Sequence, residues 1–152
     1  MQKTGASPNK IAQIDIRVSS HATEDQEKVQ TAVRNLFPQE MAEGLVFEKT
    51  SLLGHHGNPI LLITAKITDK KTLPKALENM GSKLSSLDKE TLQKEWLLHL
   101  DKSNLFLRFD KQSAYLGSVH FSNVDPIHVK IHFKTKMPEE IEEICRKSGL
   151  LP

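Results

Sequence analysis

The sequence predicts an α+β fold, in which a mostly antiparallel sheet carries helices packed on one face. The clearest observation is the segment 127–134, where Ile, Val and Phe alternate without a break with His and Lys. Successive side chains of a strand point to opposite faces, so this strand buries one side and turns four basic or protonatable groups to the other. The second observation is the order of the periodic segments: strand, helix, hairpin, helices, hairpin, strand, helix. An antiparallel sheet of this kind can leave its second face to water.

The size and composition of the chain indicate one globular domain. Of its 152 residues, 38% are hydrophobic and 26% are charged. We expect a single domain over 10–152, preceded by a flexible polar tail at 1–9 that contains Gly5 and Pro8. The net charge is only +2, so a nucleic-acid partner has to be argued from the distribution of the charges and not from their sum.

Six strands are expected from alternating or continuous apolar residues. In the first, Ile14, Ile16 and Val18 alternate with polar residues. The turn at 54–59, with two glycines and an Asn-Pro pair, joins the second strand to the third, and the turn at 110–113 joins the fourth to the fifth. In chain order the expected strands are 10–20, 45–53, 60–67, 104–109, 114–119 and 127–134.

Helices are expected where apolar residues recur at helical spacing between capping signals. The first begins at a capping box formed by Thr23 and Gln26 and ends before Pro38. Three more are expected at about 72–80, at about 85–100 and from Pro138 onward, and Gly81 breaks or bends the first of these.

The charges separate by element. Acidic side chains gather on the expected helices, whereas the outward positions of the expected strands are mainly basic. The outward cations are Arg17, Lys66, Arg108, Lys130 and Lys134, against the acids Asp15 and Glu48. His128 and His132 would add charge if nearby phosphates favoured their protonated form. Phe106 is expected beside the outward Arg108, with Tyr115 on the next strand, and aromatic rings beside cations on a sheet form a stacking platform for unpaired bases.

This pattern favours RNA binding through a basic sheet face and two polar turns. The cations would contact phosphates, and the polar turn residues would contact bases or 2′-hydroxyls. The candidate RNA-binding residues are Arg17, His55, His56, Asn58, Lys66, Arg108, Lys111, Gln112, Lys130 and Lys134.

The sequence offers little for a metal site or for catalysis. The histidine pair at 55–56 lacks the further ligands that zinc needs, and His128 and His132 would lie about 13 Å apart on one strand. An enzyme would have to use that pair together with Asp15 and Asp110, and no motif connects these residues. We therefore expect no metal, no cofactor and no enzyme activity.

The single cysteine, Cys145, excludes an internal disulfide and lies among apolar residues, which predicts a buried structural thiol in a reducing compartment. The chain contains no run of about 18 apolar residues and starts without an apolar signal-peptide core. We expect a cytoplasmic protein that does not enter a membrane.

Three segments together resemble a family of small archaeal proteins described as predicted RNA-binding proteins or predicted exosome subunits. They are 16–25 (IRVSSHATED), 54–60 (GHHGNPI) and 107–117 (LRFDKQSAYLG), and the likeness runs from about Ile11 to Leu150. The family is similar in fold to the large-subunit ribosomal protein that binds 5S ribosomal RNA, an α+β sandwich with an antiparallel sheet. The resemblance implies RNA binding, an archaeal cytoplasmic source and an association with RNA processing or the exosome, and it brings no catalytic residues with it.

Two other functions are compatible with these observations. One is a protein-binding adaptor subunit of an RNA-processing complex, without affinity of its own for RNA. The other is a metal-dependent RNA-processing enzyme.

Overall fold

The computed structural model describes residues 10–152, and the tail predicted at 1–9 lies outside the described residues. Its strands form a six-stranded sheet in the order β2-β3-β1-β6-β5-β4, and every neighbouring pair of strands is antiparallel. In chain order the strands are β1 (Ile11–His21), β2 (Glu48–Leu53), β3 (Pro59–Ile67), β4 (Leu100–Asp101), β5 (Asn104–Phe109) and β6 (Ile127–Phe133).

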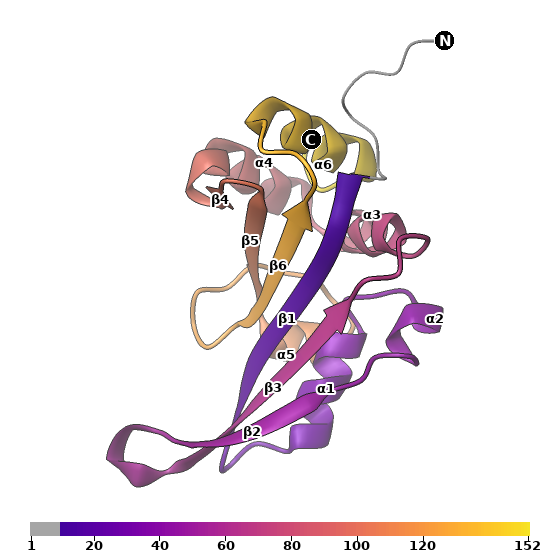
Figure 1. The fold of residues 1–152 in the computed structure, drawn as a ribbon. Helices are drawn as coiled ribbons and strands as arrows, with labels where there is room; N and C mark the ends of the chain where they lie inside the picture. Colours follow the sequence, from indigo (N-terminus) through magenta and orange to yellow (C-terminus); the bar gives the residue numbers. More distant parts are fainter. Residues whose placement is uncertain (1–9) are drawn as a thin grey trace.

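Six α-helices and two short 3-10 helices accompany these strands in the described residues. They are α1 (Gln26–Arg34), α2 (Gln39–Ala42), η2 (His55–Gly57), α3 (Leu73–Lys83), α4 (Ser86–Lys94), η3 (Trp96–Leu98), α5 (Lys111–Tyr115) and α6 (Pro138–Ser148). Figure 1 shows α1, α3 and α5 behind the sheet, and the hairpin of β2 and β3 projecting beyond the body with η2 at its tip.

Alternation along the strands divides the sheet into a covered face and an open face. In β6, Ile127, Val129, Ile131 and Phe133 are each at most 1% exposed, whereas the histidines and Lys130 between them are half-buried. Each buried side chain of this size contributes about 2 kcal/mol of transfer free energy, so the helices stay on the apolar face. The α+β class with a mostly antiparallel sheet is therefore confirmed.

Helix α1 starts at a different cap from the one that the sequence indicated. The Asp25 carboxylate accepts a hydrogen bond from the Glu27 N–H at 2.9 Å, and the Glu24 carboxylate accepts one from the His21 N–H at 2.9 Å. The predicted Thr23–Gln26 capping box is therefore wrong by two residues, because an aspartate follows closely enough to cap the same turn.

The strand predicted at 114–119 is wrong. Lys111–Tyr115 form α5, and Asp110 caps it: the Oδ2 atom of Asp110 accepts hydrogen bonds from the Ser113 N–H at 2.8 Å and from the Ser113 hydroxyl at 2.7 Å. The stretch read as a tight turn is thus the start of a helix, since an aspartate three residues before a serine supplies an N-cap. Tyr115 consequently lies on a helix and not on the open face of the sheet.

The helix predicted over about 85–100 is shorter than expected. It ends at Lys94, and the chain continues through η3 into the two-residue strand β4. Gly81, which was expected to break or bend its helix, lies inside α3. A glycine is needed there because the chain at the C-terminus of α6 passes close by: a Cβ atom on Gly81 would be 2.6 Å from the Gly149 carbonyl carbon. Gly81 thus serves close packing of α3 against α6.

Candidate nucleic-acid interface

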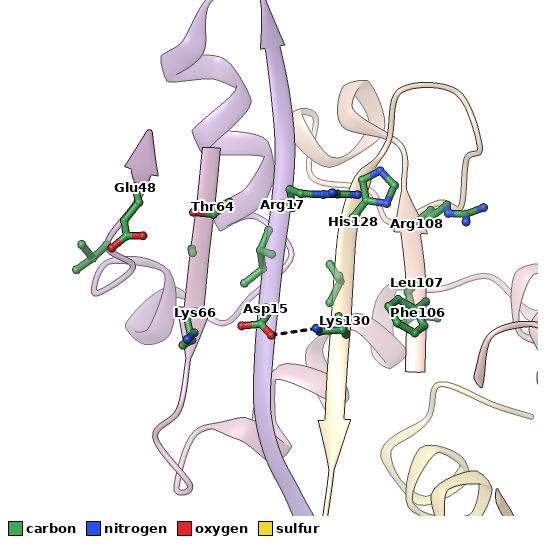
Figure 2. A pocket seen from close by; sticks show the side chains of 14 residues that line it. Asp15, Arg17, Glu48, Thr64, Lys66, Phe106, Leu107, Arg108, His128 and Lys130 are labelled. Carbon is green, nitrogen blue, oxygen red and sulfur yellow. Dashed lines mark ion pairs between the residues drawn. The ribbon is translucent and has the colours of Figure 1, made fainter. Parts of the chain in front are cut away.

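The register of the sheet arranges the polar side chains of the open face in rows that cross the strands. Residues that face each other in an antiparallel pair point to the same side, about 5 Å apart. One row runs Glu48, Thr64, Arg17, His128, Arg108 across β2, β3, β1, β6 and β5. The next row runs Lys66, Asp15, Lys130, Phe106, and Figure 2 shows both rows side by side. A third row contains Gln13, His132 and Asn104.

The first two rows line a groove of about 760 Å³ on the open face, which we call the sheet groove (Figure 2). Its charged lining consists of four cations and two carboxylates. We call the four cations the groove cations; they are Arg17, Lys66, Arg108 and Lys130. All four were predicted as RNA contacts from strand parity, and the structure brings them together on one open surface. The groove therefore carries an excess of positive charge although the whole chain is almost neutral.

His128 lies between the two arginines of its row and is half-buried. Burial lowers the pKa of His128, the positive charges of Arg17 and Arg108 lower it further, and Asp125 opposes them. Its surroundings therefore disfavour the protonated imidazole in the free protein. Arg108 is held by its neighbouring loop, since its Nη1 atom donates a hydrogen bond to the Asn123 Oδ1 atom at 3.3 Å.

The second row is less strongly basic because Asp15 interrupts it. The Asp15 carboxylate accepts hydrogen bonds from the Gln13 amide at 2.9 and 3.0 Å, and its Oδ2 atom lies 3.8 Å from the Lys130 Nζ atom. That ion pair is long, and both side chains are partly exposed, so water weakens it. Lys130 keeps donor capacity for a ligand, and Lys66 on the other side of Asp15 is exposed.

Lys134 follows β6 directly and is exposed, at the end of the sheet. The Lys70 side chain lies at hydrogen-bonding distance and lowers the pKa of the Lys134 ammonium, by that contact and by like-charge repulsion. Lys70 comes from the loop after β3, and strand parity gave no signal for it. Neither lysine lines the groove, so this predicted contact lies outside it, at the end of the sheet.

Lys111 is bound inside the protein. Its Nζ atom lies 2.8 Å from the Ser19 carbonyl oxygen, 3.0 Å from a Glu24 carboxylate oxygen and 2.7 Å from the Asp125 Oδ2 atom. Its side chain is only 13% exposed. These acceptors use all three donors of the ammonium. We call Lys111, Glu24 and Asp125, together with His21, whose Nε2 atom lies 3.0 Å from Asp125 Oδ2, the Lys111 cluster.

The remaining predicted contacts do not join the groove. The pair at 55–56 and Asn58 lie at the tip of the β2–β3 hairpin, where His56 adopts a left-handed backbone conformation with φ of 65°. Gln112 is exposed on α5, which packs against α1 behind the sheet (Figure 1). The structure therefore separates the two polar turns from the basic sheet face.

The groups that could serve catalysis or bind a metal are engaged elsewhere. The hydrogen bonds from Ser113 lower the pKa of the Asp110 carboxyl, which caps α5. His21, Glu24 and Asp125 lie close enough to share a cation, and the ammonium of Lys111 occupies the space between them. The predicted burial of Cys145 is confirmed, and this burial raises the pKa of its thiol above its ordinary value.

Two polar residues of the open face were not predicted from the sequence. Thr64 lines the groove and Gln13 lies in the third row, and the sequence did not mark them because neither is charged. Knowledge of the pairing register between β1 and its two neighbouring strands would have placed both residues on the open face.

No helix in the described part of the chain has the length and apolar character needed to cross a membrane.

Comparisons with known proteins identify the family of this chain. A family model described as RNA binding matches residues 13–133. A Pyrococcus abyssi protein named as an RNA-binding protein is 43% identical over 124 residues, which cover 80% of this chain and 80% of the relative.

Solved structures of archaeal proteins share the fold. A protein from Archaeoglobus fulgidus assigned to DUF54 is 30% identical, with a TM-score of 0.77 over 91% of this chain and 99% of that one. A DUF54 protein from Methanothermobacter thermautotrophicus is 27% identical, with a TM-score of 0.73 over 93% and 98% of the two chains. With the family model covering most of its length, the chain belongs to the RNA-binding family.

Proposed function

We propose that the protein binds RNA without cleaving it, and that the sheet groove contacts the RNA backbone. The observation that carries this proposal is the gathering of the groove cations, from four different strands, on an open surface with only two carboxylates. Such a surface attracts the phosphates of an RNA whatever its base sequence. These contacts therefore position the RNA and do not distinguish one base sequence from another. Family membership supports the same ligand.

The salt dependence of binding tests the proposal. If the four groove cations each neutralise a phosphate of an unpaired strand, the logarithm of the affinity falls with the logarithm of salt concentration at a slope of about −2.8, taking ~0.7 per contact. We expect Arg17→Ala and Arg108→Ala each to weaken binding about tenfold and to flatten the slope by about 0.7. Fluorescence anisotropy with a labelled RNA of about twelve nucleotides measures both effects.

Lys147→Ala is the matched control, because Lys147 is exposed in the last turn of α6 and does not line the groove. It removes the same charge and should leave both affinity and slope close to those of the wild type. Equal losses in Lys147→Ala and Arg108→Ala would show that binding follows net charge and would contradict a role for the groove.

The proposal includes an association with RNA processing, for which the family resemblance to predicted exosome subunits is the support. A protein contact has a candidate surface in η3, where Leu97 and Leu98 are 74% and 84% exposed. Affinity capture after nuclease treatment, from an archaeal lysate, tests this part. Exosome subunits recovered by the wild type and lost with Leu97→Ser/Leu98→Ser support it, whereas recovery that ends with nuclease treatment shows that RNA alone joins the proteins.

A further inference from the structure

We propose that the sheet groove takes an unpaired RNA strand and that one of its bases stacks on Phe106. This inference rests on the proposed function and names its ligand class. Phe106 is 39% exposed on β5, whereas Leu105 and Leu107 beside it are at most 1% exposed. Phe37, Phe109 and Phe133 are all at most 3% exposed, and Phe47 and Phe121 are partly buried against the core, so Phe106 is the most exposed phenylalanine in the described residues.

The neighbours of Phe106 are groups that RNA recognition uses. Lys130 faces it across the β5–β6 pair, and Arg108 stands two residues further along β5, about 7 Å away. Figure 2 shows the ring beside Lys130 in the groove. A base lying on the ring would therefore have cations within reach of the phosphates that flank it.

A polar pair lies on the other side of the ring. Asn104 stands two residues before Phe106, and its Oδ1 atom lies 2.7 Å from the His132 Nδ1 atom. When Nδ1 donates this hydrogen bond, the Nε2 atom of His132 accepts and the Asn104 amide donates. A base on Phe106 would thus meet both an acceptor and a donor at its edge.

The spacing of the groove cations also favours a single strand. Through the register they form a zigzag from Lys66 to Arg17, Lys130 and Arg108 across β3, β1, β6 and β5. Each step joins diagonal neighbours on adjacent strands, about 7 to 8 Å apart. This step is comparable with the distance between successive phosphates of an extended RNA strand. A duplex keeps its bases stacked inside, where the ring cannot reach their planes.

The test compares a labelled mixed-sequence RNA of about twelve nucleotides, single-stranded or annealed to its complement, by anisotropy. We expect the full chain to bind the single strand at least about tenfold more tightly than the duplex. Phe106→Leu should weaken single-strand binding about tenfold, with little effect on the duplex, and Phe106→Tyr should restore it. Leu116→Ala is the control, since Leu116 is exposed and outside the groove.

Phe106→Trp adds a fluorescence measurement that would not change if Phe106 had only a structural role. Stacking of a base quenches an indole in the groove, whereas Trp96 is 5% exposed and supplies a constant background. Duplex bound as tightly as single strand, or single-strand affinity unchanged in Phe106→Leu, overturns the inference even if Arg17→Ala and Arg108→Ala still weaken binding. If these arginine variants bind like the wild type, the proposed function fails, and the inference fails with it.

Discussion

The sheet groove and the Lys111 cluster are two regions that contain cations predicted from the sequence to contact RNA. In the cluster, an ammonium lies within 3.0 Å of acceptors from three separate segments. In the groove, whose lining belongs to the described residues, the shortest ion pair of a cation with a carboxylate is 3.8 Å long, between Lys130 and Asp15. Lysine therefore has two roles here, and the partners that it finds in the fold decide between them.

The comparison teaches how to separate structural cations from those that bind a ligand. A buried ammonium must be matched by acceptors, since an unpaired charge away from water is costly. An exposed cation loses little when it has no partner, because water solvates it. The groove can keep an uncompensated positive charge only because its face is open, and the same openness admits RNA.

The largest expected effect comes from breaking the Lys111 cluster. Lys111→Met keeps the aliphatic stem but removes the ammonium that Glu24, Asp125 and the Ser19 carbonyl oxygen share. We expect the free energy of unfolding to fall by about 2–3 kcal/mol and the melting temperature by about 5–10 °C. Urea and thermal unfolding followed by circular dichroism measure this loss.

Binding measurements on the same variant sharpen the contrast. The RNA affinity of Lys111→Met should stay within about threefold of the wild type, because its ammonium has no donor left for a phosphate. Lys147→Met, at an exposed position, should change stability by at most about 0.5 kcal/mol. A Lys111→Met variant that is fully stable but has lost RNA affinity would show that Lys111 contacts RNA, and would contradict the distinction between structural and RNA-binding lysines.

Strands β1, β3, β5 and β6 and the groove cations that they carry could be predicted because both follow from alternation. Alternation is visible between neighbours in the sequence: the apolar parity of 127–134 fixes which side of β6 is covered and therefore which side carries Lys130. The same reasoning applied to β1 and β5 places Arg17 and Arg108 on the open face.

The partners of those residues could not be predicted, because parity sets the face and leaves the neighbours undetermined. Lys111 reaches Ser19 and Glu24, which are 92 and 87 residues away in the chain. Its cluster forms only because Asp110 starts a helix there and turns the chain toward α1. The mistaken strand at 114–119 and the unforeseen partners of Lys111 thus have one origin, an N-cap interpreted as a turn.

A smaller effect is expected from pH. The pKa of His128 is lowered in the free protein by burial and by Arg17 and Arg108, against Asp125. Phosphates in the groove would raise this pKa, so binding takes up a proton, and affinity should rise about threefold as the pH falls from about 7.5 to about 5.5. The stability of the free protein should change in the opposite direction and fall in acid. The reason is that the unfolded chain binds this proton more readily than the folded protein does.

Oligouridine is the suitable ligand for this measurement, because uridine gains no proton in that interval. His128→Asn should remove most of the pH dependence while leaving the affinity at neutral pH almost unchanged. His120→Gln is the control, as His120 is exposed and lies 3.5 Å from Asp88, away from the groove residues. If the affinity of His128→Asn keeps the same pH dependence, another group takes up the proton and His128 does not respond to the bound RNA.

The smallest effect, and the most direct probe of the charge in the groove, is expected from Asp15→Asn. The amide keeps the shape of the carboxylate and removes the acid that pairs with a groove cation, at 3.8 Å from Lys130. Because phosphates are repelled by Asp15, affinity should rise about two- to threefold at about 50 mM salt, with a smaller gain at about 200 mM. Stability should change by less than about 1 kcal/mol, since the pair is exposed. A loss of affinity would instead mean that the carboxylate accepts a hydrogen bond from a base or a 2′-hydroxyl, and the groove would then select its RNA as well as attract it.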